Sequence, residues 1–323
     1  MKNIFLFTFF CATTVAYGAT SCYDEEKLPA VSRLEVSEKE VIAYLGGSAI
    51  SDDGNSAKAV SFSPVKGWQR IGARPCERCD LPKYSCGKWK GQIVLSTADV
   101  STIPNNGHWC NTENNITSCQ QKDGAVWFSI SYYDGEGCGG VGGFGRKKGD
   151  AIEYRWPKEL RDSSVGPILY DGGRIWAGTY HSYECTGEVA AKGLVVYDWR
   201  NNTLKTFVGG NNGPCGAIVH DLLLHDDKIW VATDLGLSIF NKKTEIWKNL
   251  APGKAGEPAM SEVHCDALYN SVLWDLVRVP TEGYENFNSY YAMLVDSVRA
   301  IRPNQKFSEI SELEVSSRPP AGR

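Results

Sequence analysis

The stretch Lys228-Ile229-Trp230-Val231-Ala232-Thr233 decides the fold of this chain. It is a β-prone run that follows the turn residues Asp226-Asp227, and a first strand is expected over 219–224, before that turn. Two more β-prone runs follow, at 237–240 and 244–247, each after its own turn. Four short strands joined by tight turns predict an antiparallel sheet in which each strand pairs with the next.

The pattern of a turn, an aliphatic residue and a tryptophan occurs four times along the chain. The tryptophans are Trp127, Trp176, Trp230 and Trp274, spaced 49, 54 and 44 residues apart. A period of about 40–55 residues with several strands in each unit is typical of β-propeller blades. One tryptophan at the same place in each blade predicts that these side chains pack between blades, where each buries roughly 200 Å².

We therefore expect an all-β protein, a single β-propeller of five or six four-stranded blades, with seven as the upper limit, stabilised by disulfides. The propeller domain should cover residues 19–310, and the polar end of the chain, 311–323, should be a flexible tail. Five blades are expected at 30–71, 108–160, 164–208, 217–250 and 261–310. The irregular, cysteine-rich stretch over 72–119 includes residues 72–107, which are numerous enough for a sixth blade.

The blade around Trp230 resembles the repeat of two-component-regulator propellers. Those blades carry an Asp-Gly turn, an aliphatic-Trp pair, a threonine, then Gly-Leu and an aromatic residue. Here Ile229 to Thr233 with Gly236 to Phe240 match that repeat, and Ile175 to Thr179 with Gly193 to Tyr197 match it with an insertion. The resemblance is clearest over 164–250. It implies a propeller and says little about activity, because propellers carry unrelated functions.

The first 18 residues have the order of a secretory signal peptide. A basic start is followed by an apolar run over 4–15 and by small residues around 16–19. That run is shorter than the roughly 20 residues a membrane-spanning helix needs. We expect residues 1–18 to be removed and the mature protein to be secreted or periplasmic, with no membrane span.

Net charge limits the partners. The formal charge is −4 and the isoelectric point is about 5.8. Nucleic-acid binding needs concentrated lysine and arginine, so nucleic acid is not an expected partner. The expected partner is therefore a protein, peptide or glycan ligand.

Ten of the 11 cysteines lie beyond the signal peptide, and an even number in an exported chain predicts disulfides, up to five of them. The pairing stays open, although Cys138 with Cys185 would join corresponding loops of two neighbouring blades. The pair Cys76 and Cys79 also has the spacing of half a zinc knuckle or of a redox motif, but structural disulfides are favoured. The candidates are Cys22, Cys76, Cys79, Cys86, Cys110, Cys119, Cys138, Cys185, Cys215 and Cys265.

Two histidines hold the same place in two blades. His220 and His264 are 44 residues apart, as are the tryptophans that follow each of them by ten residues. This place is near the start of the innermost strand, which lines the channel of a propeller. Two imidazoles there are able to bind a metal or move protons, but a polar channel face also carries histidine without chemistry. Tyr180 and His181 are further candidates for ligand binding.

The rest of the chain carries no catalytic signature. A formal G-x-G-x-x-G lies within 134–145, but no helix pattern follows it, so a dinucleotide site is rejected in favour of a loop on one rim. The leading hypothesis is a binding module without a cofactor, acting through its loop-lined face or its central channel. The alternative is a lyase or hydrolase that works in the channel with His220 and His264 and a divalent metal.

Overall fold

Four antiparallel sheets, each built from consecutive strands, form most of the structure. The computed structural model describes residues 31–45, 56–75, 88–89, 92–93, 95, 114–132, 141–161, 163–180, 192–207 and 212–265. Sheet I holds β1 (Val31–Ser37), β2 (Glu40–Leu45), β3 (Ser56–Ser63) and β4 (Gly67–Pro75). Sheet II holds β7 (Asn114–Lys122), β8 (Ala125–Tyr132), β9 (Gly143–Lys148) and β10 (Ala151–Arg155). Sheet III holds β11 (Ser164–Asp171), β12 (Arg174–Tyr180), β13 (Leu194–Asp198) and β14 (Thr203–Phe207). Sheet IV holds β15 (Val219–His225), β16 (Lys228–Thr233), β17 (Gly236–Asn241) and β18 (Ile246–Pro252), with β19 (Met260–Glu262) as a fifth strand.

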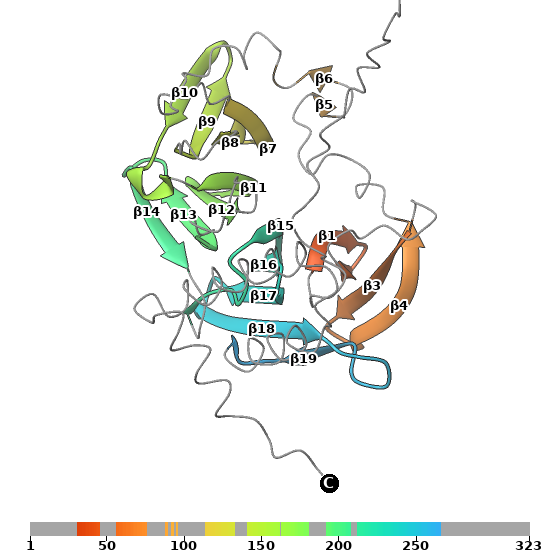
Figure 1. The fold of residues 1–323 in the computed structure, drawn as a ribbon. Helices are drawn as coiled ribbons and strands as arrows, with labels where there is room; N and C mark the ends of the chain where they lie inside the picture. Colours follow the sequence, from red (N-terminus) through yellow and green to blue (C-terminus); the bar gives the residue numbers. More distant parts are fainter. Residues whose placement is uncertain are drawn as a thin grey trace, which may run out of the picture.

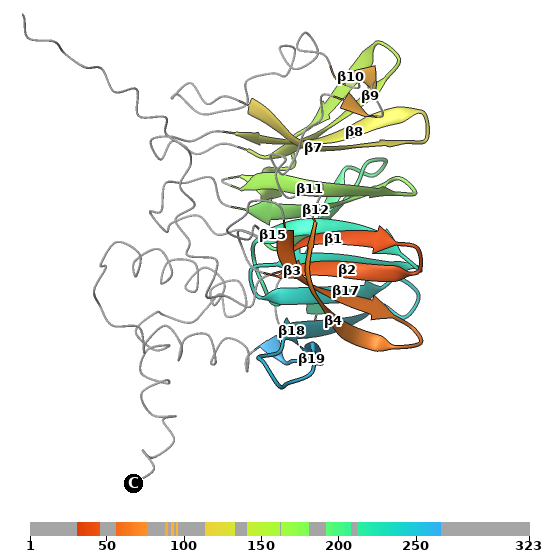
Figure 2. The same ribbon diagram turned by 90° about the vertical axis from the view of Figure 1, so that its right-hand side faces the viewer.

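The sheets are the blades of a β-propeller. Figure 1 shows them around a common centre, with β1, β7, β11 and β15 innermost, and Figure 2 shows the same sheets from the side. The all-β prediction is confirmed, and sheets I to IV correspond to the blades expected at 30–71, 108–160, 164–208 and 217–250. A 3₁₀ helix, η2 (Lys158–Leu160), joins sheets II and III.

The hairpin turns confirm the pattern on which the repeat was identified. The turn before each described blade tryptophan has positive φ at both central residues, for example 53° and 69° at Asp123 and Gly124. At Asp226 and Asp227 the values are 51° and 56°. Two consecutive residues of this kind make the two-residue hairpin whose twist matches that of the strands it joins.

The blade tryptophans pack between sheets, as expected. Trp127 lies in a core cluster shared by sheets II and III, and Trp176 in one shared by sheets III and IV. Trp230 lies in a cluster shared by sheets IV and I. Each of these three blade tryptophans therefore contacts the next sheet around the ring. Trp274 lies outside the described residues.

Sheet IV packs directly on sheet I. The innermost strand β1 of sheet I contacts β15 and β16 of sheet IV. Residues 266–310 of the blade expected at 261–310 lie outside the described residues, so that blade stays a prediction.

The position between sheets I and II is where a short two-stranded sheet lies. It consists of β5 (Lys88–Trp89) and β6 (Gln92–Ile93). Leu95, which follows β6, is buried against Val126 and Phe128 on the face of sheet II that points away from sheet III. The cysteine-rich stretch over 72–119, which is long enough to hold a sixth blade, therefore packs against sheet II at Leu95.

One disulfide is described in full. Cys215 and Cys265 are joined, with their Cα atoms 5.1 Å apart, and Cys119 is also disulfide-bonded. The other candidate cysteines, including Cys138 and Cys185, lie outside the described residues. The described part of the chain contains no helix long and apolar enough to cross a membrane.

Candidate functional site

The channel candidate His220 is buried on the innermost strand β15, with 6% of its surface exposed. Its neighbour Asp221 is also buried, and the Asp221 Oδ2 atom accepts a hydrogen bond of 2.9 Å from the backbone N–H of Leu34. This bond joins β15 to β1 across two sheets. Asp221 therefore contributes to closing the ring.

The second candidate, His264, lies in different surroundings. It is exposed and not in a strand, two residues after β19. It follows β19, which pairs with the outermost strand β18, and the residues after Cys265, where the expected innermost strand would run, lie outside the described residues. Among the described residues no group of three His, Cys, Asp or Glu side chains is placed to hold a metal ion. Tyr180 is the last residue of β12, and His181 lies outside the described residues.

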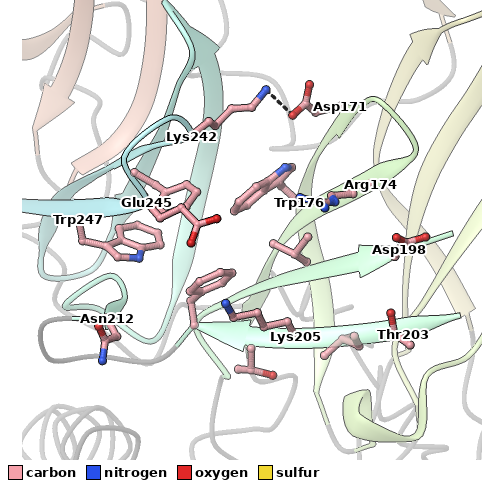
Figure 3. Close-up of a pocket in the computed structure, with 15 residues that line it drawn as sticks. Asp171, Arg174, Trp176, Asp198, Thr203, Lys205, Asn212, Lys242, Glu245 and Trp247 are labelled. Atoms are coloured by element: carbon pink, nitrogen blue, oxygen red, sulfur yellow. Dashed lines mark ion pairs between the residues drawn. The ribbon is translucent and has the colours of Figure 1, made fainter. Parts of the chain in front are cut away.

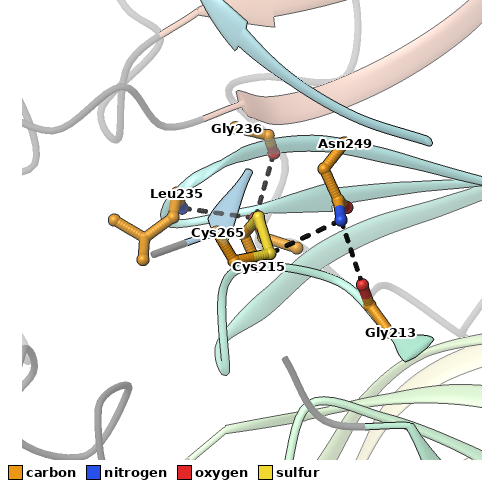
Figure 4. The surroundings of a disulfide bond; sticks show 7 residues. Gly213, Cys215, Leu235, Gly236, Asn249 and Cys265 are labelled. Carbon is orange, nitrogen blue, oxygen red and sulfur yellow. Dashed lines mark hydrogen bonds between the residues drawn. A yellow bond between two sulfur atoms is a disulfide. The ribbon is translucent and has the colours of Figure 1, made fainter. Parts of the chain in front are cut away.

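A groove of about 870 Å³ opens between the outer parts of sheets III and IV (Figure 3). One wall is β14, all five residues of which line it, and the other wall is the hairpin of β17 and β18. The remaining lining residues are Asp171, Arg174, Trp176, Val196, Asp198, Asn212, Phe240, Lys242, Glu245 and Trp247.

Four aromatic side chains from the two sheets form the apolar part of the groove. Trp176 and Phe240 are buried, with ring centroids 5.4 Å apart. Phe207 and Trp247 are half-buried, one from each wall, and their centroids are 5.6 Å apart. The buried Nε1 atom of Trp176 has no hydrogen-bond partner in the structure. Nine of the 15 residues that line the groove are polar or charged, so the aromatic floor is enclosed by mainly polar walls.

Charged groups surround this aromatic floor. Lys242 forms an ion pair of 2.5 Å with Asp171 across the groove. Hydrogen bonds from Asn201, first of all from its backbone N–H, hold the pKa of Asp198 below its usual value. The Lys205 Nζ atom lies 4.6 Å from the centroid of Phe207, and no ion pair joins it to any residue the structure describes. A cation over an aromatic face is attracted to it, so Lys205 has a defined place in the groove while its charge stays uncompensated.

The equivalent space between sheets II and III is filled. Trp199 packs edge-on against Trp127 at 5.1 Å, and the Arg155 guanidinium lies 4.7 Å from the centroid of Trp199. Arg146 covers the Trp127 ring at 5.4 Å. Aromatic and guanidinium groups thus occupy the place that is open between sheets III and IV.

The space between sheets IV and I is filled as well. Trp68 is the equivalent of Trp247, because each pairs with the phenylalanine of its third strand. This space is closed instead by the Arg70 Nη2 atom, which donates hydrogen bonds of 2.6 Å to the carbonyls of Gly253 and Lys254. Met260 is buried in the same core cluster. Of the three inter-sheet spaces described, the one between sheets III and IV is the open one.

Sequence reasoning pointed to the channel and the rim, and it missed this groove. The signal that would have found it is one residue in the turn after the third strand. Trp199 and Lys242 hold the same place, because each donates its backbone N–H at 3.1 Å to the turn before its own sheet's tryptophan, at Gly173 and Asp227 respectively. A lysine at 242 leaves open the space that a tryptophan at 199 fills.

No protein-family model and no curated protein matches the chain. Solved structures resemble it at low identity and low TM-score. The extracellular domain of a protein described as a hybrid two component system from B. thetaiotaomicron is 13% identical, with a TM-score of 0.29 over 73% of this chain and 23% of that one. The chain therefore spans less than a quarter of that structure.

Two glycosidase structures also resemble the chain. A β-xylosidase/α-arabinofuranosidase from a compost microbial metagenome is 7% identical, with a TM-score of 0.30 over 73% of this chain and 90% of that one. An arabinanase from Bacillus subtilis is 11% identical, with a TM-score of 0.29 over 75% of this chain and 81% of that one.

Proposed function

We propose that this protein is an exported, non-enzymatic binding module that holds part of a protein, peptide or glycan ligand in the groove between sheets III and IV. The observation that carries the proposal is the open groove itself. The space between sheets II and III is filled by Trp199, and the space between sheets IV and I is closed by Arg70 on the loop after β18, whereas this one combines an aromatic floor with charged walls. The strands that form its walls, β14, β17 and β18, lie on the outer part of the ring (Figure 1), so an elongated ligand has access to the groove.

The disulfide between Cys215 and Cys265 supports an oxidising compartment, since such bonds are rare in the cytosol. Together with the leader pattern of residues 1–18, it supports secretion or a periplasmic location. We test this by expressing the full chain in a bacterial host, fractionating the cells and sequencing the N-terminus of the mature protein. Intact protein in the cytosol, with residues 1–18 still attached, would refute export.

A screen of the purified protein against a peptide library and a glycan array tests the binding function. We expect Trp247→Ala to weaken binding of a selected ligand about tenfold, because this half-buried ring forms one wall of the groove. The matched control is Ile246→Ala, since Ile246 is 65% exposed and does not line the groove. A ligand that binds Trp247→Ala and the wild type equally would show that the groove is not the binding site.

The channel remains a second candidate site, because His220 and Asp221 are both buried on the innermost strand. A lyase or hydrolase working there with a divalent metal predicts a stoichiometric metal in the purified protein. That metal should be lost when His220 and His264 are both replaced by alanine. Elemental analysis of the two proteins distinguishes this function from a simple binding module.

A further inference from the structure

Sheet IV carries a fifth strand that shows how an extended segment adds to the outside of a blade. Strand β19 pairs antiparallel with β18, with Glu262 opposite Leu250. The backbone N–H of Val263 then donates a hydrogen bond of 2.9 Å to the carbonyl of Asn249. The Lys248 Nζ atom forms an ion pair of 2.9 Å with the carboxylate of Glu262. One acidic residue and one lysine thus accompany the main-chain pairing.

Sheet III has the same lysine at the same place. In both sheets a leucine follows a glycine at the start of the third strand: Leu194 pairs with Phe207 of the fourth strand, and Leu237 pairs with Leu250. A lysine lies two residues before each of those fourth-strand partners. In β14 it is Lys205, which pairs with Val196, and in β18 it is Lys248, which pairs with Ile239. Lys205 of sheet III is therefore the structural equivalent of Lys248 of sheet IV.

The edge of sheet III differs from that of sheet IV in being open. Among the described strands, none pairs with the outer side of β14. All five residues of β14 line the groove, and the Lys205 ammonium rests over the ring of Phe207 without an ion pair to another described residue. The carbonyl acceptor and the lysine that β19 contacts on sheet IV thus have counterparts on sheet III, at Thr206 and Lys205, that no described strand occupies.

We propose that an extended, acidic segment of a partner protein adds to β14 as a fifth strand of sheet III. In the register of β19, an acidic residue of this segment lies opposite Phe207 and pairs with Lys205, and the next backbone N–H donates to the carbonyl of Thr206. Side chains on the inner face of the segment enter the groove beside Trp247. This inference rests on the proposed binding function and names its ligand as a peptide strand.

Main-chain hydrogen bonds supply affinity in strand addition, while side chains in neighbouring pockets supply specificity. A lysine on an edge strand can also protect a sheet from aggregation, because its charge discourages pairing with other chains. Sheet IV favours a role in binding over a role in protection, since Lys248 does not prevent a fifth strand and instead forms an ion pair with Glu262 of that strand. An edge lysine of this kind selects an acidic strand over a neutral or basic one.

The first experiment uses a fluorescein-labelled peptide that copies residues 258–263, Pro-Ala-Met-Ser-Glu-Val, and measures its fluorescence anisotropy with the full-length protein. We expect saturable binding below about 1 mM. Lys205→Glu should weaken binding about tenfold, because attraction is replaced by repulsion. A peptide with lysine in place of its glutamate should bind Lys205→Glu better than it binds the wild type.

The matched control is Lys148→Glu, which reverses the charge of an exposed lysine that does not line the groove. It should change the affinity less than about twofold. This control separates a pairing at Lys205 from the effect of net charge. Equal effects of the two substitutions, or absence of binding at about 1 mM, would overturn the proposal.

The second experiment tests main-chain pairing. The same peptide, N-methylated at its valine, cannot donate the hydrogen bond that Val263 makes in sheet IV, and we expect it to bind at least about tenfold more weakly. Hydrogen exchange should show the amides of β14 protected by the unmodified peptide, and those of β10 unchanged. Binding that survives N-methylation, or protection elsewhere, would refute strand addition. If only glycans bind in the groove, this inference fails and the proposed binding function stands.

Discussion

The two interfaces of sheet III each contain one blade tryptophan, Trp127 of sheet II and Trp176 of sheet III, in different settings. On the side of sheet II, Trp127 stacks on Tyr170 at 4.2 Å, and its Nε1 atom donates a hydrogen bond to the carbonyl of Lys122. On the side of sheet IV, Trp176 stacks on Phe207 at 6.0 Å, and its Nε1 atom has no partner in the structure. The interface between sheets II and III is packed as far as its outer edge. The interface between sheets III and IV is open at its outer edge, where the groove lies.

Side-chain hydrogen bonds add to this difference. Gln120 accepts a bond of 2.6 Å from the backbone N–H of Tyr170, and the Ser129 hydroxyl donates one of 2.7 Å to the carbonyl of Gly166. Both join sheet II to sheet III. Between sheets III and IV the two backbones approach closely instead, since a Cβ added to Gly178 would lie 2.5 Å from the Cβ of Val219. Repeated blades therefore specify a ring, and the residues added to each interface determine which spaces stay open.

The largest expected effect is on the stability of the two interfaces. Trp127→Ala should destabilise the protein by about 4 kcal/mol, and Trp176→Ala by about 3 kcal/mol, because Trp127 also loses a hydrogen bond and its contacts with Trp199 and Arg146. Urea unfolding followed by circular dichroism measures both. Equal losses of unfolding free energy, or a larger loss for Trp176→Ala, would contradict the prediction that the interface with sheet II is the more tightly packed one.

The next effect concerns the residue that fills the space between sheets II and III. Trp199→Lys should cost about 2–3 kcal/mol, because it removes a buried ring that contacts Trp127, Tyr197 and Arg155. It should also open a groove there, visible in a crystal structure of the variant. A stability equal to that of the wild type would mean that Trp199 does not close this interface.

The reciprocal change should have little effect on stability. Lys242→Trp places in the open groove the residue that fills the neighbouring space, at the cost of a partly exposed ion pair with Asp171, so we expect a change within about 1 kcal/mol. Binding of the peptide that copies residues 258–263 should fall about tenfold, as measured by anisotropy. Lys243→Trp, at an exposed neighbouring position outside the groove, is the control. Unchanged binding by Lys242→Trp would place the ligand elsewhere.

The smallest effect is a pH dependence at the edge of the groove. The pKa of Asp198 is lowered in the folded protein by hydrogen bonds from Asn201, so the ionised carboxylate stabilises the fold. That contribution is complete above the unfolded pKa, near 3.8, and is lost as the pH falls through the lower folded value. Thermal melts of the wild type and Asp198→Asn should therefore differ slightly at pH 6 and converge on acidification. A difference that grows below pH 4 would contradict this.

The repeat was readable because it depends on local chemistry. Tight turns such as Asp226-Asp227 and the β-prone run around Trp230 appear in the sequence as they appear in the sheet. The histidine overlay stays a prediction for His264, because the residues from 266 onwards, Trp274 included, lie outside the described part of the chain. His264 follows a strand that extends sheet IV outwards, a pairing that no local signal marks.

The sequence by itself determined the all-β class, the tryptophan repeat and the positions of sheets I to IV, since hairpin pairing is set by residues close along the chain. Only the tertiary structure decided that sheet IV packs directly on sheet I, and that the space beside Trp176 stays open while the one beside Trp127 is filled. The reason is physical. Ring closure and inter-sheet packing depend on contacts between residues far apart in the chain, such as Leu34 with Asp221, and their geometry is set by how all the sheets fit together.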